Sequence, residues 1–515
     1  MSMNNQGRVT APNEISSAKF ESFSGNKALD QATKLIFETG SFKKTGIDFP
    51  KPKGIKYRLG GLEQTKNIEL PGLSEPETLR HYVRLSQKNY AIDLGVYPLG
   101  SCTMKHNPRL NEKVARLPGF SDVHPLQPIA TVQGALELMY ELSNWLTKLC
   151  NMPAVALTPK AGAHGELCGM MTIRARLDAD GNSHKRRVFV PESAHGTNPA
   201  TAVQCGFFVD ELPANDKGCI DMDVLRLKIS DLGSDNDIAG IMLTNPNTCG
   251  LFESDIIEIS ELIHNAGGYF YCDGANFNAL VGRVRPGDLG VDAMHINLHK
   301  TFSPPHGGGG PGSGPTVLSD ALKDYAPIPY VVKDKSGRFD LVEDINDISM
   351  GRLCAFHGQM GMYTRALSYM MSHGSDGLKQ ATEDAVLNAN YILASLSDLM
   401  TPAYSGHCMH EVLFDDTFLQ NTGVDTLDFA KALIDEGYHP MTMYFPLVVH
   451  GAMLIEPTES ESKYELDRFI TTMRGLANRA KSGDIKSFKS APQHSPTKRV
   501  DETLAARKPV LRYEP

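Results

Sequence analysis

The sequence has few of the features that mark secreted, metal-binding or membrane proteins. Its nine cysteines are scattered without a C-x-x-C pair, and their odd number argues against a disulfide framework. The spacing of the cysteines is not that of a metal cluster, so we predict no metal site. No apolar run is long enough to span a membrane, and the first fifty residues resemble neither a secretory signal nor a transit peptide. We therefore expect a cytoplasmic protein that does not contact a membrane.

Positive charge is also scarce. The 515 residues carry a formal net charge of −9, and only the short, partly acidic tail over 498–512 is dense in lysine and arginine. This balance argues against nucleic acid as a partner and favours small acidic or neutral molecules. An apolar content of 41% in a chain of this length can bury a large core, which suggests two or three domains.

The centre of the chain alternates between short apolar segments and helical patterns. The segments suited to buried parallel strands are 187–190, 207–209, 238–243, 269–272 and 293–297. Helices are expected between them, for example over 221–229 and 254–266, and a long amphipathic helix is expected over 132–150. This alternation predicts an α/β fold with a mostly parallel sheet that is covered on both faces.

The pattern divides the chain into five parts. We predict a loosely ordered arm over 1–33, an N-terminal wrapping segment over 34–130, a large domain over 131–375, a smaller C-terminal α+β domain over 376–490 and an extended tail over 491–515. The wrapping segment is rich in turn signals, with one clear helical stretch near 75–88. Within it, residues 100–105 form a compact polar loop that the local pattern assigns to a structural turn.

One lysine occupies an unusual position. Lys300 ends an apolar stretch and is followed by a run over 303–315 that is too rich in glycine and proline for a helix or strand. It can be explained as a lysine at a strand end with its amine in solvent. It can also be a desolvated amine that reacts with a carbonyl, as in the Schiff base with pyridoxal phosphate. The local pattern alone favours the first explanation.

Pyridoxal phosphate would also require a carboxylate, an anion site and a flat group against its ring. Asp273 follows the segment 269–272 and could pair with the ring nitrogen, with the small Ala275 against the ring. Gly162 and Ala163 lie in a run of small residues before a helical pattern, which suits phosphate binding. In isolation, each of these features is also typical of an ordinary turn or a loop-to-helix junction.

Two further side chains follow predicted strands. His195 lies just past 187–190 and could stack on a ring, and an asparagine side chain of the segment 244–250, just past 238–243, could donate to a phenolic oxygen. Because the carboxyl ends of parallel strands meet at one edge of a sheet, the candidates should converge there. Their shared position, together with the order of Asp273 and Lys300 along the chain, favours a fold-type-I pyridoxal-phosphate site.

Longer motifs resemble the glycine dehydrogenase (decarboxylating) family, the P-protein of the glycine cleavage system. The motifs lie at 97–105, 161–166, 193–200, 271–276, 297–302 and 456–459. The likeness covers nearly all of the chain from about residue 35, and the length resembles that of subunit 2 of the family's two-subunit form. It implies a large pyridoxal-phosphate-binding domain and a smaller C-terminal domain.

The resemblance also implies roles for individual residues. Lys300 would form a covalent aldimine with pyridoxal phosphate, Asp273 would pair with the ring nitrogen, His195 and Ala275 would lie on the two ring faces, Gly162 and Ala163 would contact the phosphate, and Asn247 would contact the phenolic oxygen. His299 and His306 are candidates for proton transfer. The glycine loop over 307–314 would shape a channel for a lipoyl arm.

The implied reaction is the decarboxylation of glycine, with release of carbon dioxide and transfer of the aminomethyl group to the lipoyl arm of H-protein. The implied assembly is an α2β2 tetramer with a homologous subunit 1. The main alternative is another fold-type-I enzyme, an aldolase or aminotransferase, which would share Lys300 and Asp273 but would not use lipoyl protein. A metal site that includes His295, His299 and His306 is disfavoured, because two prolines break any helix that would align them.

Overall fold

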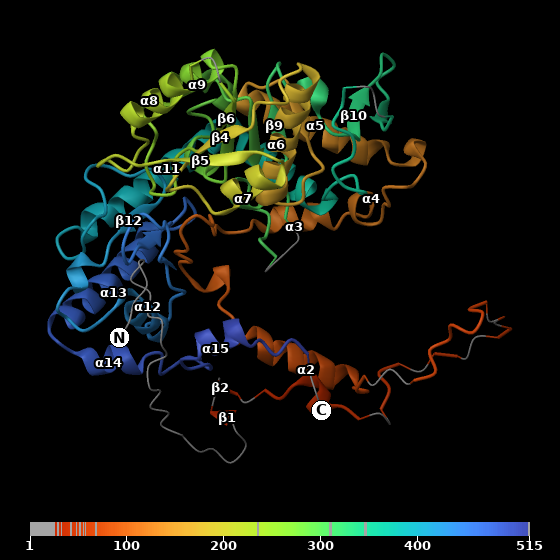
Figure 1. Cartoon of the computed structure of the whole chain (residues 1–515). Helices are drawn as coiled ribbons and strands as arrows, with labels where there is room; N and C mark the ends of the chain where they lie inside the picture. The colour runs from red at the N-terminus through yellow and green to blue at the C-terminus, as the bar shows by residue number, and fades with distance from the viewer. Residues whose placement is uncertain are drawn as a thin grey trace. The chain divides into compact units, whose positions relative to one another are not determined.

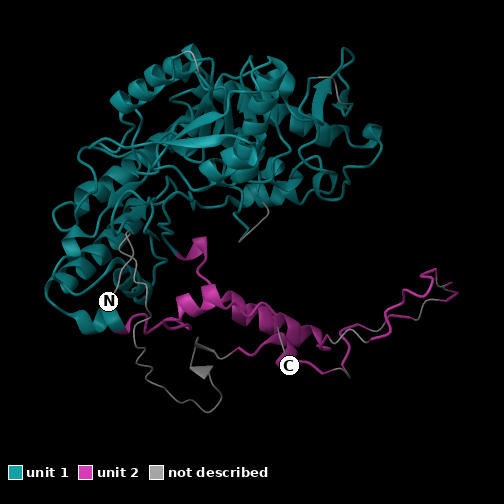
Figure 2. Cartoon of the chain, in the orientation of Figure 1, with its two compact units in different colours: residues 1–11, 95–489 teal, residues 12–94, 490–515 magenta. Residues whose placement is uncertain are grey.

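The computed structural model describes residues 26–27, 30–31, 33–41, 44–47, 49–50, 53–54, 56, 58–66, 70–233, 236–307, 312–344 and 348–512. Most of the predicted N-terminal arm and the centre of the glycine loop, 308–311, lie outside these residues. The chain divides into two compact units (Figure 2). The first contains residues 95–489, and the second contains the described residues between 12 and 94 together with those after 489.

A seven-stranded sheet forms the centre of the first unit (Figure 1). Its strands are β3 (Ala154–Ala156), β4 (Arg187–Pro191), β5 (Phe208–Leu212), β6 (Ile238–Thr244), β7 (Tyr269–Gly274), β8 (Ala293–Ile296) and β9 (Thr316–Leu318). They lie in the order β3-β9-β8-β7-β6-β4-β5, and β9 runs antiparallel to both of its neighbours while the other pairs are parallel. The predicted α/β fold with a mostly parallel sheet is confirmed.

Helices cover both faces of this sheet, and the alternation of side chains along β7 shows how. Phe270 and Cys272 pack into a core with α5 (Gln133–Cys150) and α9 (Ile256–Asn265). Tyr271 points to the opposite face, where it joins a core formed with α6 (Gly162–Ala179) and α7 (Thr197–Gln204). Because successive side chains of a strand alternate between faces, apolar residues at every position of β7 can be buried.

The first unit ends in a three-stranded antiparallel sheet. Its strands β12 (Val412–Phe414), β13 (Thr442–Met443) and β14 (Met453–Ile455) lie in the order β12-β14-β13, beside α12 (Thr426–Asp435) and α13 (Lys463–Lys481). The long α11 (Met360–Leu396) crosses the expected domain boundary at 375/376, and Gly374 interrupts its helical backbone there with φ 63°. The predicted domain boundaries stay a prediction.

The second unit contains α2 (Glu75–Ser86) and the short α15 (Glu502–Arg507). The carboxylate of Glu77 accepts the backbone N–H of Ser74 at 2.9 Å, which satisfies a donor at the start of α2. Several large apolar side chains of α2 are exposed, namely Leu79, Tyr82, Val83 and Leu85. Among the described residues of either unit, no helix is both long and apolar enough to cross a membrane.

Candidate active site

A cavity of about 390 Å³ lies at the carboxyl edge of the seven-stranded sheet, where the loops after β4, β6, β7 and β8 meet. Seven of the nine candidate residues line it: Lys300, Asp273, His195, Ala275, Gly162, Ala163 and His306. The sheet therefore brings together side chains that are far apart in the sequence.

The amine of Lys300 is held by a backbone carbonyl. Lys300 lies on α10 (Leu298–Thr301), a single turn that follows β8, and its Nζ donates to the carbonyl oxygen of Ser101 at 2.7 Å. The side chain is half-buried and borders the cavity. The amine is therefore positioned to meet a bound molecule.

Asp273 is a buried carboxylate with several donors. One oxygen accepts the N–H of Ala275 at 2.9 Å and lies 3.4 Å from Nε2 of His295, and the other accepts from the Asn198 amide at 3.1 Å. Burial opposes ionisation, but His295 and these donors together lower the pKa of Asp273. The ionised carboxylate can therefore pair with a cation, such as a protonated ring nitrogen, in the cavity.

The small residues at the start of α6 permit a close approach to β8. A Cβ atom on Gly162 would lie 2.8 Å from Nδ2 of Asn297, and one on Gly165 would lie 2.5 Å from Cβ of His295. A larger residue at either position would move the helix away. The first N–H groups of a helix have no intrahelical acceptor, and Gly162 and Ala163 line the cavity, so this end of α6 is suited to bind an anion.

His195 lies at the exposed side of the cavity. Its Nδ1 accepts the backbone N–H of Thr197 at 3.2 Å, and the Thr197 hydroxyl donates to Glu166 at 2.7 Å. The imidazole ring meets Phe445 edge-on, with 5.8 Å between the ring centroids. Glu166 is buried, so the chain of contacts fixes the orientation of His195 from inside the protein.

His299 and His306 lie next to each other, with ring centroids 5.2 Å apart. Nδ1 of His299 accepts the N–H of Ser313 at 3.3 Å. Burial, assisted by the charge of Lys300, lowers the pKa of His299 to about 3 and that of His306 to about 4. Both rings are therefore neutral near pH 7, and His306 is the one that lines the cavity.

The structure does not bring the Asn247 side chain into the cavity. Asn247 is buried, and its amide donates to the Gly218 carbonyl at 2.8 Å and to Glu253 at 3.0 Å. Its carbonyl oxygen accepts the N–H of Cys249 at 3.0 Å, so the side chain shapes its own loop. The neighbouring Thr248 lines the cavity instead.

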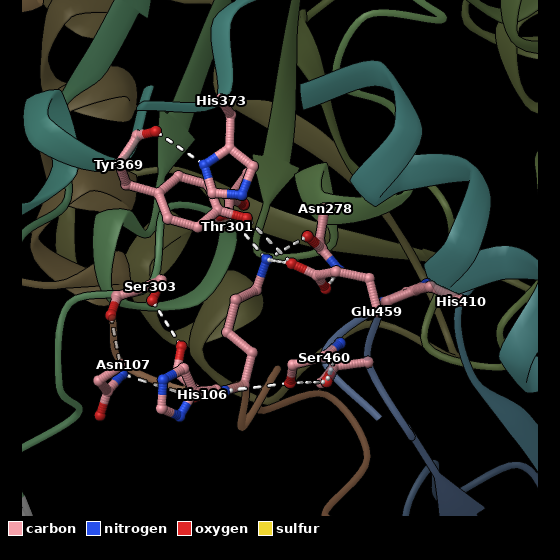
Figure 3. Close-up of polar contacts among 12 residues, drawn as sticks. His106, Asn107, Asn278, Thr301, Ser303, Tyr369, His373, His410, Glu459 and Ser460 are labelled. Atoms are coloured by element: carbon pink, nitrogen blue, oxygen red, sulfur yellow. Dashed lines mark hydrogen bonds and ion pairs between the residues drawn. The ribbon is translucent and has the colours of Figure 1, made fainter. Parts of the chain in front are cut away.

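The segment 101–107 lies along 300–303, a contact that the local sequence pattern did not indicate. Besides the bond from Lys300 to Ser101, three bonds join the segments: Lys105 Nζ to the Thr301 carbonyl at 3.0 Å, Asn107 Nδ2 to the Ser303 carbonyl at 2.7 Å, and the Ser303 hydroxyl to the His106 carbonyl at 2.7 Å (Figure 3). We call this arrangement the lysine clasp. The loop 100–105, assigned above to a structural turn, is part of the candidate site.

Lys105 is the buried centre of the lysine clasp. The residue is 4% exposed, and its Nζ contacts Glu459 at 2.5 Å and Asn278 at 2.7 Å (Figure 3). The hydroxyl of Tyr369 donates to the same carboxylate at 3.0 Å. The motifs 97–105 and 456–459, which carried part of the family resemblance, therefore meet through a buried ion pair, and that resemblance was the only signal for it.

Comparison with known proteins identifies the family. A family model described as "Glycine dehydrogenase, C-terminal domain" matches residues 381–499. A Caulobacter vibrioides protein named "Probable glycine dehydrogenase (decarboxylating) subunit 2" is 63% identical, over 100% of this chain and 98% of its own length. The chain belongs to the glycine dehydrogenase (decarboxylating) subunit 2 family. A relative of the same name from Kosmotoga olearia is 49% identical, over 93% of this chain and 99% of its own length.

Solved structures agree with the fold of this family. The glycine decarboxylase P-protein of the glycine cleavage system, in inhibitor-bound form, superimposes with a TM-score of 0.69 at 19% identity, covering 81% of this chain and 93% of that one. Glutamate decarboxylase of Lactobacillus brevis gives a TM-score of 0.59 at 15% identity, covering 84% and 96%. The fold is that of the fold-type-I pyridoxal-phosphate enzymes, and the predictions of family, enzyme and fold are confirmed.

Proposed function

We propose that this chain binds pyridoxal phosphate and catalyses the decarboxylation of glycine, with release of carbon dioxide and transfer of the aminomethyl group to the lipoyl arm of H-protein. The observation that carries the proposal is the convergence of the Lys300 amine, the buried Asp273 carboxylate and the start of α6 on one cavity. Membership of the glycine dehydrogenase (decarboxylating) subunit 2 family supports the substrate and the reaction.

The cavity fits the cofactor in three respects. Lys300 would hold the cofactor covalently, and the ionised Asp273 would pair with its ring nitrogen. Gly162 and Ala163, at the N-terminus of α6, would bind the phosphate through backbone N–H groups. When bound, pyridoxal phosphate supplies an electron-poor ring that accepts the electron pair left as glycine loses carbon dioxide.

The remaining residues of the proposal orient groups and move protons. His195 and Ala275 line the cavity and would lie on the two faces of the ring. His306 and the adjacent His299 are neutral near pH 7 and would hold a proton next to Lys300 only transiently, because their lowered pKa values make both rings weak bases. The contact predicted for Asn247 is not part of the proposal, because its amide is bonded within its own loop.

The proposal includes two protein partners and a compartment. Relatives that cover the whole chain are named as subunit 2, which supports an α2β2 assembly with a subunit 1. The exposed apolar side chains of α2 in the second unit are suited to a protein interface. H-protein would deliver the lipoyl disulfide that accepts the aminomethyl group.

All nine cysteines are free thiols, which supports a reducing compartment such as the cytoplasm.

The test is the variant Lys300→Ala, assayed with glycine, subunit 1 and lipoylated H-protein. We expect it to lose the visible absorbance of the bound cofactor and to slow glycine–bicarbonate exchange by at least about 10³-fold, because the group that holds the cofactor is removed. Lys323→Ala is the control, since that lysine is exposed and pairs with Asp320. An unchanged band in Lys300→Ala would contradict the proposal. Exchange that does not respond to H-protein would favour an aldolase or aminotransferase.

A further inference from the structure

Two buried carboxylates lie under the loop that holds the Lys300 amine. Glu411, before β12, accepts the N–H of Ser101 at 2.8 Å, and Glu456, after β14, accepts the N–H of Thr103 at 2.9 Å. Both glutamates are 0% exposed. The second oxygen of each has no hydrogen-bond partner among the residues that the structure describes. One oxygen of each carboxylate and one ring nitrogen of His410 lie within 4.8 Å of one another.

Two full negative charges are not stable at this separation without solvent. Burial, and next the charge of Glu456, raise the pKa of Glu411 well above its usual range. Burial likewise raises the pKa of Glu456 to about 7. His410 cannot neutralise the pair, because burial lowers its pKa to about 3. One proton bound between the two carboxyl groups removes the repulsion and leaves a single negative charge.

The two glutamates also stabilise an unfavourable backbone conformation in the loop 100–103. Ser101 and Thr103 have φ values of 61° and 47°, a region that residues with side chains rarely occupy. The hydrogen bonds from their N–H groups to the two glutamates, and one from Thr442 to the Gly100 carbonyl at 2.8 Å, hold this conformation. It directs the Ser101 carbonyl to the Lys300 amine.

We propose that Glu411 and Glu456 share one proton and act as positioning residues for Lys300, by fixing the loop 100–103. The charged and titratable groups that face the pair are Lys300, Lys105, His410, Cys102, Cys249 and Cys408. Two lysines near the site make a bound divalent cation unfavourable, whereas a shared proton leaves a charge that they can balance. The inference rests on the proposed function only in taking Lys300 as the lysine that holds the cofactor.

The test compares Glu411→Gln, Glu456→Gln and the double variant in the holoenzyme. Glutamine keeps the acceptor for the loop N–H, so the fold should be retained. If the pair carries one charge, each single variant still leaves one carboxylate to ionise, and the pH midpoint of the cofactor absorbance should move little. The double variant removes the only charge and should lower the midpoint by about one pH unit. A shift of about one pH unit in either single variant would overturn the shared proton.

Infrared spectroscopy of the full chain provides a second readout that does not need the cofactor. Near neutral pH the spectrum should contain a protonated-carboxyl band from the pair that the double variant lacks, while the band from Glu461 remains. Glu461→Gln is the matched control. Burial also raises the pKa of Glu461 to about 7, but Glu461 is not one of the residues that hold the loop 100–103. The absence of such a band, or a stoichiometric metal ion that the double variant loses, would overturn the proposal. If no cofactor band forms at all, the proposed function fails and the infrared result alone decides this inference.

Discussion

At the scale of single residues, Lys105 is the side chain on which the lysine clasp depends. Its ammonium is bonded to Glu459, Asn278 and the Thr301 carbonyl in the interior of the first unit. We expect Lys105→Met to lower the free energy of unfolding by about 3–5 kcal/mol, because it leaves a buried carboxylate unpaired. Urea unfolding measures this loss.

Two further variants test whether the loss of stability in Lys105→Met comes from the unpaired charge of Glu459. Adding Glu459→Gln to Lys105→Met should restore part of the stability, since it removes the unpaired charge. Lys463→Met breaks an exposed pair with Asp467 and should cost less than about 1 kcal/mol. A loss in Lys105→Met no larger than in Lys463→Met would show that the buried pair does not hold the segments together.

The buried ring of His306 makes the free energy of unfolding depend on pH. Burial lowers its pKa to about 4 in the folded chain, against an ordinary value of 6.5 for histidine. Between these values the unfolded chain binds a proton that the folded chain does not, so stability is full above pH 6.5 and is lost as the pH falls toward 4, by up to about 1.4 kcal/mol per pH unit from this one group. Thermal unfolding between pH 7 and 5 should show a smaller loss in His306→Asn than in the parent chain. An unchanged slope would contradict the burial of a neutral ring.

At the scale of elements, the approach of α6 to β8 sets the geometry of the cavity. In Gly165→Ala the new Cβ would meet the His295 Cβ at 2.5 Å and the Gly314 carbonyl oxygen at 2.7 Å. We expect a loss of about 1–3 kcal/mol in stability, as for other overpacked sites. A weaker affinity for pyridoxal phosphate should accompany it, because His295 contacts Asp273. Equilibrium unfolding and cofactor titration measure the two effects.

Gly134→Ala is the matched control for this substitution. Gly134 also lies in a helix, α5, but an added Cβ there would meet no other described heavy atom within 4 Å beyond its chain neighbours and the helix's own backbone. Alanine favours a helix over glycine by up to about 1 kcal/mol, so this variant should be neutral or slightly more stable. If both alanine variants behaved alike, close packing of α6 would not explain the run of small residues.

The elements also show what a sequence can and cannot reveal. Strands β4, β6, β7 and β8 were predictable because buried parallel strands consist largely of continuous apolar residues. The edge strand β5 was predictable only from its apolar start, because Asp210 and Glu211 follow. Strands β3 and β9 have only three residues each, and α7 includes Pro199, so their local patterns resemble loops. Asp273 and Lys300 were predictable because Asp273 lies at the carboxyl end of β7 and Lys300 follows β8. The contact of Lys300 with Ser101 was not, because it joins residues 199 positions apart.

At the scale of the whole molecule, the second unit carries the prediction about assembly. On α2, Leu79 is 63% and Val83 45% exposed. Replacing both with glutamate should leave the thermal unfolding of the isolated chain unchanged, because neither side chain is buried. It should weaken association with subunit 1 by at least about tenfold if α2 lies in that interface. Sedimentation of the mixed subunits provides the measurement.

Arg84→Glu is the control for charge alone, because it places a carboxylate in the last turn of the same helix without removing an apolar side chain. Association that survives the loss of Leu79 and Val83 would place the interface elsewhere on the chain. Weakening by Arg84→Glu to the same degree would indicate electrostatic attraction in place of apolar contact.

The lysine clasp has a consequence for how the protein is made. Lys105 and Thr301 are joined to each other directly and to Glu459 through the buried ion pair, so three distant parts of the chain must be present together. On the ribosome, the strands that carry Asp273 and Lys300 emerge well before Glu459, and domains begin to fold as they emerge. The nascent chain can therefore build its sheet before Lys105 is paired with Glu459, and the lysine clasp is completed as a late step of synthesis.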